Sequence, residues 1–93
     1  MKVYQSRSFA NTVKKLSEKE KTALDREIKN ILANPGLGTE KAGDLRGVFV
    51  HKFKLGGVLY LLAYRLTGDD LELIMFGPHE NYYRDLKTYL KSR

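Results

Sequence analysis

The spacing of apolar residues changes near residue 48, and this change constrains the fold more than any other feature of the chain. Before it, apolar side chains recur every three to four residues, as they do along one face of a helix. After it they alternate: in VFVHKFKL (48–55), Phe49 and Phe53 fall on one face of a strand, and Lys52 and Lys54 on the other. The chain is therefore expected to combine a helical block with a block of strands.

Two amphipathic helices are predicted in the first block. A short one is expected from Phe9 to Leu16, where apolar residues recur at three- and four-residue intervals. A longer one begins at the capping box formed by Ser17 and Glu20 and ends before Pro35-Gly36. Because a tight turn joins them, the two helices should form an antiparallel hairpin.

Four strands are predicted around this hairpin of helices. A short one lies at the N-terminus, and Gly56-Gly57 is a turn of the kind that joins two antiparallel strands. The second of these, VLYLLAYRL (58–66), is apolar on both faces and should lie in the centre of the sheet. LELIMFG (71–77) is the last strand, and Pro78 suits the first turn of a closing helix.

These elements predict a single domain over residues 1–93 of the α+β class, in the order β-α-α-β-β-β-α. The helical hairpin is expected to pack on one side of a mainly antiparallel four-stranded sheet. The length of 93 residues is sufficient for one hydrophobic core and too short for two.

Composition limits the classes of function. The formal net charge of +6 suits a nucleic acid or an acidic protein as partner. The absence of cysteine excludes disulfides, a thiolate nucleophile and cysteine-based zinc sites. The N-terminus lacks the apolar region of a signal peptide, and the longest run without charge or glycine, residues 58–64, is too short to cross a bilayer. A cytoplasmic protein without a membrane role is expected.

Side chains that carry protons and hydrogen bonds concentrate in GPHENYYRDLK (77–87), where the last strand meets the closing helix. A helix N-terminus has free amide donors and favours anions, which makes this junction a candidate phosphate site. A purely structural reading is also open. His79, Tyr83, Leu86 and Leu90 fit one stripe of an amphipathic helix, in which His79 and Tyr83 would be its polar edge.

Lys52 and Lys54 are predicted to project from one strand face about 6–7 Å apart, where like charges repel unless an anion lies near. Alone, such lysines often only protect a sheet edge. Together with His79 and with Tyr82 or Tyr83, they would supply the acid, base and cations that RNA cleavage needs without a metal or cofactor. We therefore expect His79 to transfer protons and the two lysines to bind phosphate, while a tyrosine donates a proton or stacks on a base.

The other histidine is expected to be structural. His51 shares a strand face with Phe49 and Phe53 and should be partly buried against a partner. A metal site formed by His51 and His79 has no supporting motif.

Three segments, LRGVFVHKFKL (45–55), LYLLAYRL (59–66) and GPHENYYRDLK (77–87), together with the order of elements, resemble the RelE/ParE superfamily of bacterial toxins from toxin–antitoxin pairs. The resemblance covers nearly the whole chain. It implies a RelE-like fold and a small toxin held inactive by an antitoxin that wraps around it. In the RelE-like branch the toxin enters the ribosomal A site and cuts mRNA without metal; in the ParE branch it poisons DNA gyrase.

The resemblance also implies roles for particular residues. The K-x-K of RelE-like toxins matches Lys52 and Lys54. Their catalytic His or Arg after the last strand is similar in position to His79, and their C-terminal catalytic Tyr resembles Tyr82 or Tyr83.

One position departs from the pattern. RelE-like toxins often have Arg after the Tyr of the third strand, whereas here Leu61 follows Tyr60, and leucine cannot hold a phosphate. Arg46, Arg65 and Arg84 are the candidates to bind RNA in its place.

Most of the catalytic set is retained, and this favours a ribosome-dependent mRNA endoribonuclease that inhibits translation. Inhibition of DNA gyrase is the alternative, and a module that binds nucleic acid or antitoxin without catalysis is a third possibility. The expected partners are the ribosome with mRNA, or gyrase, and an antitoxin. An acidic, amphipathic antitoxin segment would fold as it covers Lys52, Lys54 and His79.

Overall fold

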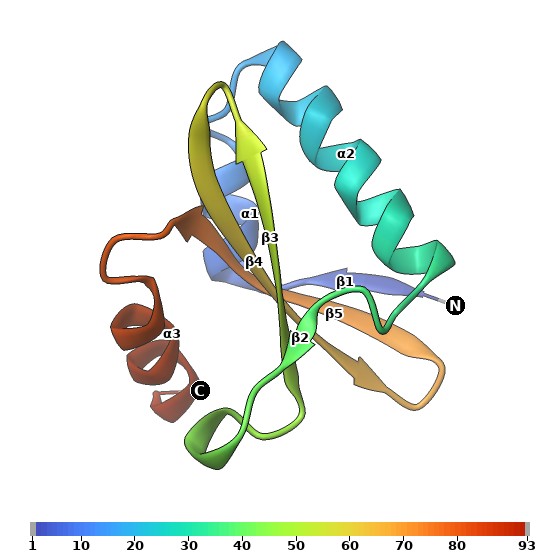
Figure 1. Ribbon diagram of the computed structural model, residues 1–93, viewed down its shortest axis with the longest axis vertical. Coiled ribbons are helices and arrows are strands. Elements are labelled where there is room, and N and C mark those ends of the chain that lie inside the picture. Colours follow the sequence, from blue (N-terminus) through green and yellow to red (C-terminus); the bar gives the residue numbers. More distant parts are fainter. Residues whose placement is uncertain (1, 93) are drawn as a thin grey trace.

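The computed structural model describes residues 2–92, which form a five-stranded sheet with helices on both faces (Figure 1). The strands are β1 (Val3–Gln5), β2 (Thr39–Glu40), β3 (Val48–Leu55), β4 (Val58–Thr67) and β5 (Asp70–Pro78), in the spatial order β1-β5-β4-β3-β2. The helices are α1 (Arg7–Val13), α2 (Glu18–Ala33) and α3 (Tyr82–Lys91), with a short 3₁₀ turn at Gly43–Leu45. Strand β1 pairs parallel to β5, and the other pairs are antiparallel.

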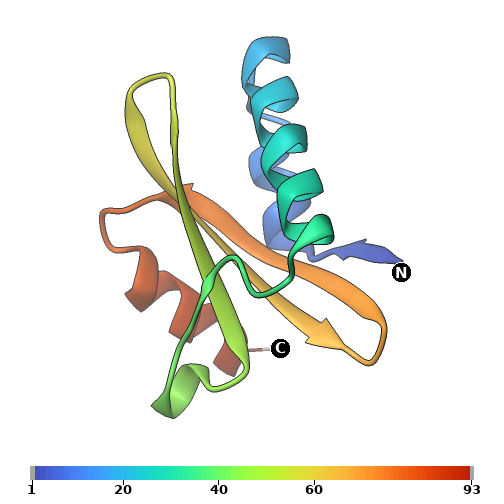
Figure 2. The same cartoon turned by 45° about the vertical axis from the view of Figure 1, so that its right-hand side comes forward.

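The sheet separates two apolar cores. Helices α1 and α2 cover one face of the sheet and α3 covers the other, as both Figure 1 and Figure 2 show. The first core contains Phe9 of α1 and Leu24 of α2, and the second contains Leu86 of α3. The α+β class expected from the sequence is confirmed. No helix in residues 2–92 has the length and apolar character needed to cross a membrane.

Local signals in the sequence fix the helix starts. Ser6 caps α1 by accepting the Phe9 amide at 3.0 Å. The predicted capping box of α2 is present, with the Ser17 hydroxyl accepting the Glu20 amide at 3.2 Å and the Glu20 carboxylate accepting the Ser17 amide at 2.9 Å. These bonds satisfy amides that have no partner inside the helix.

The hairpin of β3 and β4 follows the predicted register, from Val48 opposite Arg65 to Leu55 opposite Val58. Gly56 and Gly57 have φ angles of 60° and 84°, the left-handed values that a two-residue hairpin turn requires. Strand β4 is central, and its middle residues 61–64 are completely buried. The predicted hairpin and central strand are thus confirmed.

The sheet has five strands rather than the four expected. Strand β2 pairs with β3, and the loop before it is held by the buried Tyr64 side chain. The Tyr64 hydroxyl accepts the Gly38 amide at 2.9 Å and donates to the Pro35 carbonyl at 2.7 Å. Burial raises the pKa of this phenol, so its donated proton is retained. A two-residue strand has no periodicity of its own, and for this reason the sequence did not reveal it.

The closing helix begins later than predicted. Pro78 is the last residue of β5, opposite Tyr60, and α3 begins at Tyr82. Asn81, in the left-handed region with φ 58°, turns the chain before the helix. The prediction that His79 belongs to the same helix as Tyr83, Leu86 and Leu90 was therefore wrong. The His79 amide donates to the Leu59 carbonyl of β4, and this hydrogen bond keeps His79 outside the helix.

Replacing Tyr64 tests the loop contact. We expect Tyr64→Phe to lower the free energy of unfolding by about 1–3 kcal/mol, because two hydrogen bonds of one hydroxyl are lost and an amide and a carbonyl remain unpaired. Urea denaturation measures this change. Tyr60→Phe is the matched control, since the Tyr60 hydroxyl has no hydrogen bond within residues 2–92, and its stability should stay within about 0.5 kcal/mol of wild type. Equal losses in the two variants would contradict this account.

Candidate active site

The register of three strands brings Lys52, Lys54 and His79 to one end of the sheet. Lys54 lies opposite Leu59 in β4, and the Leu59 carbonyl accepts the His79 amide at 3.3 Å. Lys52 occupies the next row, opposite Leu61. Since neighbouring strands are about 4.8 Å apart, the backbones of Lys54 and His79 lie roughly 10 Å apart across the sheet. Lys54 and His79, which are 25 positions apart in the sequence, are thus separated in space only by strand β4.

These side chains share the face that α3 covers. Val48 and Val50 of β3 pack beneath α3, and alternation along the strand places Lys52 and Lys54 on the same side. Both lysines and His79 are exposed, because the apolar contacts of the helix lie further along this face. The result is an open surface that carries the two lysine charges.

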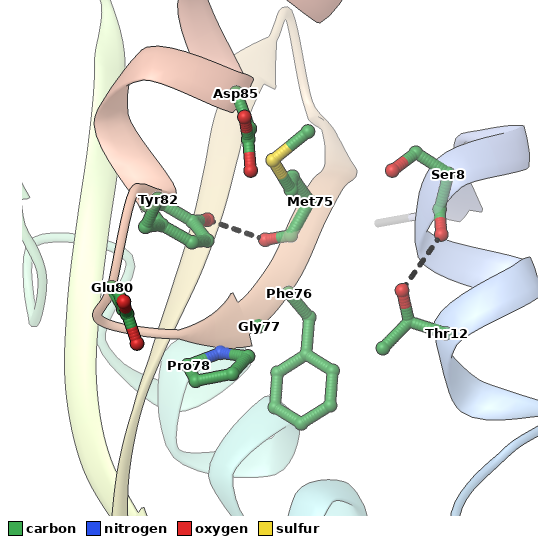
Figure 3. A pocket seen from close by; sticks show the side chains of 9 residues that line it. All are labelled: Ser8, Thr12, Met75, Phe76, Gly77, Pro78, Glu80, Tyr82 and Asp85. Carbon is green, nitrogen blue, oxygen red and sulfur yellow. Dashed lines mark hydrogen bonds between the residues drawn. The ribbon is translucent and has the colours of Figure 1, made fainter.

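The two tyrosines differ in accessibility. Tyr82 is only 3% exposed, and its hydroxyl donates to the Met75 carbonyl at 2.7 Å (Figure 3). Burial raises the pKa of the Tyr82 phenol, so it holds its proton firmly. Tyr83 is half-buried, and its ring stands edge-on to His79 with centroids 6.4 Å apart. Tyr83 is therefore the tyrosine that lies beside His79, and its hydroxyl makes no hydrogen bond to any of residues 2–92.

Helix geometry explains this difference between adjacent residues. Successive residues of a helix point about 100° apart, whereas residues four apart share a side. Tyr82 and Leu86 both point into the core beneath α3. Tyr83 is rotated to the margin of that core. We name the surface formed by Lys52, Lys54, His79 and Tyr83 the basic surface.

None of the three candidate arginines makes a hydrogen bond, ion pair or ring contact with His79 within residues 2–92. Arg65 donates to the Glu72 carboxylate at 2.8 and 3.2 Å and lies opposite Val48, about 20 Å along β3 from Lys54. The exposed Arg84 approaches its neighbour Asp85 at 3.6 Å. Arg46 is exposed beside Lys41, to which a single β-bridge connects it. Roles for these arginines in RNA binding stay predictions.

The position that lacks the expected arginine is enclosed. Leu61 is 0% exposed and belongs to the core beneath α3. A positive charge at this position would be cut off from water unless α3 moved.

Sequence reasoning missed Lys41. Its ammonium nitrogen lies 5.1 Å from the centroid of the Tyr83 ring. Its backbone amide donates to the Val48 carbonyl at 2.9 Å, which holds this residue at the sheet edge just after β2. No periodic pattern includes Lys41, so only the pairing of β2 with β3 reveals that it reaches the helix.

A cavity of about 360 Å³ lies between α1 and the start of α3 (Figure 3). Ser8 and Thr12 line one side, and the acidic residues Glu80 and Asp85 line the other. The buried ring of Tyr82 contributes to its wall. Carboxylates repel phosphate, so this hollow does not extend the basic surface as an anion site.

His51 has the structural role expected from the sequence. Its imidazole nitrogen lies 2.8 Å from the Glu27 carboxylate, and its ring stacks on Phe53 with centroids 5.5 Å apart. The pair ties α2 to β3. Within residues 2–92, no group of three or more histidine or acidic side chains is arranged to hold a metal ion.

Comparison with known proteins identifies the family. The sequence model of the ParE-like toxins of type II bacterial toxin–antitoxin systems matches residues 3–87. The chain belongs to this family. The resemblance seen in the sequence is confirmed at this level. No curated protein matches the sequence of the toxin.

Solved structures share the fold of the toxin at low sequence identity. A free form of Escherichia coli RelE with two arginine-to-alanine substitutions has a TM-score of 0.72 and 17% identity, over 99% of the toxin and 95% of that chain. A YoeB/ParE toxin from Agrobacterium tumefaciens has a TM-score of 0.69 and 22% identity, over 85% and 99%. The intact E. coli RelBE toxin–antitoxin complex contains a chain with a TM-score of 0.67 and 18% identity, over 85% and 96%. These likenesses establish the fold.

Buried Tyr82 should make the toxin sensitive to alkali. A phenol whose pKa is raised in the folded state stabilises the protein fully below its unfolded pKa near 10, and this contribution is lost as pH rises from there towards the folded value. We expect the free energy of unfolding to fall above pH 10, by at most about 1.4 kcal/mol per pH unit for one tyrosine, and to fall less steeply in Tyr82→Phe. Urea denaturation between about pH 10 and 11.5 measures both slopes. Between about pH 6 and 8 the free energy of unfolding should change with pH equally in wild type and Tyr82→Phe, because this phenol is neutral in the folded and unfolded states there. Equal slopes of the two proteins above pH 10 would contradict this explanation.

Proposed function

We propose that the toxin is a ribosome-dependent endoribonuclease that cuts mRNA without a metal ion. The basic surface carries this proposal. Lys52, Lys54, His79 and Tyr83 come from a strand, a loop and a helix, yet they lie together on one open face. Exposed groups of these types are the ones that hold a phosphate and move protons.

The proposed cleavage needs a base, an acid and positive charge at the phosphate. The base removes the proton of a ribose 2′-OH, the 2′-oxygen attacks the adjacent phosphorus, and the bond to the 5′-oxygen breaks as that oxygen gains a proton from the acid. His79 can perform either proton transfer, because an imidazole ring can both accept and donate a proton. Lys52 and Lys54 stabilise the charge that builds on the phosphate oxygens. Tyr83 stacks on a base of the single-stranded substrate or donates a proton.

We also propose that a cognate antitoxin binds the basic surface. The toxin belongs to a family of toxins from toxin–antitoxin systems, and its net charge is +6. An acidic, amphipathic segment would neutralise Lys52 and Lys54 and cover His79 while it folds. Such a partner would block RNA at the same surface.

Inhibition of DNA gyrase is the second candidate function. Two observations favour it: the matching family model is that of the ParE-like toxins, and Leu61 stands where RelE-like toxins often have arginine. Retention of the other residues of the basic surface favours RNA cleavage over this alternative.

Charge removal at the basic surface tests the proposed activity. We expect His79→Ala to lower the rate of mRNA cleavage on programmed ribosomes by about 10²–10⁴-fold, as loss of an acid or base does. Lys52→Ala/Lys54→Ala should lower it by about 10²–10³-fold, as loss of charge stabilisation does. The measurement is a single-turnover time course with purified toxin. Lys14→Ala/Lys15→Ala, which removes two exposed lysines near the end of α1, is the control and should cleave at the wild-type rate.

The same variants separate the candidate functions in cells. Mapping the 5′ ends of transcripts after induction should show cuts within translated codons that disappear in His79→Ala. DNA breaks with intact mRNA would instead assign the toxin to the gyrase inhibitors. Binding without either kind of cleavage and without growth arrest would show a module that has no catalytic activity.

Antitoxin binding gives an independent prediction. A protein encoded beside the toxin should copurify with it, and the dissociation constant should rise steeply with salt because charged surfaces are paired. Lys52→Glu/Lys54→Glu should raise this constant at least about 10-fold, a change of about 1.4 kcal/mol, by placing like charges together. Lys14→Glu/Lys15→Glu, with the same change in net charge, should leave it near the wild-type value. An equal effect of both pairs would locate the antitoxin elsewhere.

A further inference from the structure

Lys41 has an unusual environment for a lysine. It is partly buried, and no carboxylate in residues 2–92 forms an ion pair with it. Its neighbour across the isolated bridge is Arg46, another cation. Its ammonium nitrogen lies over the face of the Tyr83 ring, 5.1 Å from the ring centroid. An ammonium at this distance is attracted by the electron-rich ring face.

Tyr83 in turn is held by its ring rather than by its hydroxyl. The ring stands nearly perpendicular to Tyr82, at 5.7 Å and 89°, and to His79, at 6.4 Å and 86°. Its hydroxyl makes no hydrogen bond within residues 2–92. The orientation of the ring therefore depends on packing against the core beneath α3, on aromatic edge contacts and on Lys41.

We propose that Lys41 is a positioning residue of the ribonuclease site, holding the Tyr83 ring beside His79; this inference rests on the function proposed above. The hydrogen bond from the Lys41 backbone amide to the Val48 carbonyl fixes the backbone of Lys41 at the sheet edge, and its flexible side chain reaches the helix. The ammonium thus connects β2 with the first turn of α3. It acts on the reaction through Tyr83.

The position of Leu61 strengthens this assignment. Leu61 lies beneath α3 and cannot place a charge beside the basic surface. Lys41 approaches the same helix from the edge of the sheet, and its side chain is only partly buried. A cation therefore stands beside Tyr83 even though the central strand supplies none.

A double-mutant cycle on Lys41 and Tyr83 tests the inference. Single-turnover mRNA cleavage on programmed ribosomes is measured for wild type, Lys41→Met, Tyr83→Ala and the double variant, over a range of ribosome concentrations. We expect Lys41→Met to lower the maximal rate about 10-fold with little change in the half-saturating concentration, and Lys41→Arg to restore it to within about 3-fold, because arginine also binds ring faces. In the Tyr83→Ala background, Lys41→Met should have no further effect. Lys29→Met, on the exposed side of α2, is the control for lost charge.

The outcomes separate the two proposals. If wild type cleaves no mRNA, the proposed function fails and the role of Lys41 fails with it. If wild type cleaves and Lys41→Met matches it, only the role of Lys41 is overturned. Additive losses in the double variant would also overturn it, by showing that Lys41 does not act through Tyr83. Thermal unfolding of each variant identifies any loss of rate that comes from loss of the fold.

Discussion

The central strand β4 is apolar on both faces, so the sheet has to be covered on both sides, and the rest of the structure follows from this requirement. Helices α1 and α2 cover one face, while α3 alone covers the other. A helix of 10 residues is about 15 Å long, whereas a strand of 10 residues such as β4 is about 33 Å long. One short helix leaves part of this face open, and the lysines of β3 stand on the open part.

The start of α3 carries a structural residue, Tyr82, directly before a candidate functional residue, Tyr83. Tyr82 contributes its ring to the core and its hydroxyl to the Met75 carbonyl, so the helix is anchored to β5. That anchor fixes the direction in which Tyr83 points. The half-buried Tyr83 ring then contacts the margin of the core, His79 and the Lys41 ammonium, while its hydroxyl makes no hydrogen bond in the described part of the chain, residues 2–92. Stability and the candidate chemistry therefore depend on the same turn of helix.

The placement of positive charge follows from the cost of burial. A cation beneath α3 would lose its hydration without a partner, and the central strand carries Leu61 at that position. Arg65, further along the same strand, is neutralised by Glu72. The cations of the basic surface stand instead on the edge of the sheet, at Lys52 and Lys54, and Lys41 approaches Tyr83 from the same edge. Charge at an edge keeps contact with water and stays available to an anionic partner.

The sequence by itself determined the elements and their pairing at short range: the capped helices, the Gly56-Gly57 hairpin, the central strand, and the family. It also placed Lys52 and Lys54 on one face, because alternation along a strand is a local property. Only the tertiary structure decided that β2 joins the sheet, that β5 includes Pro78, and which tyrosine lies beside His79. Each of these depends on a contact between distant segments, such as Tyr64 with Gly38 or Leu59 with His79. A local sequence pattern predicts which face of one helix or strand is buried, whereas these contacts form only when several elements pack together.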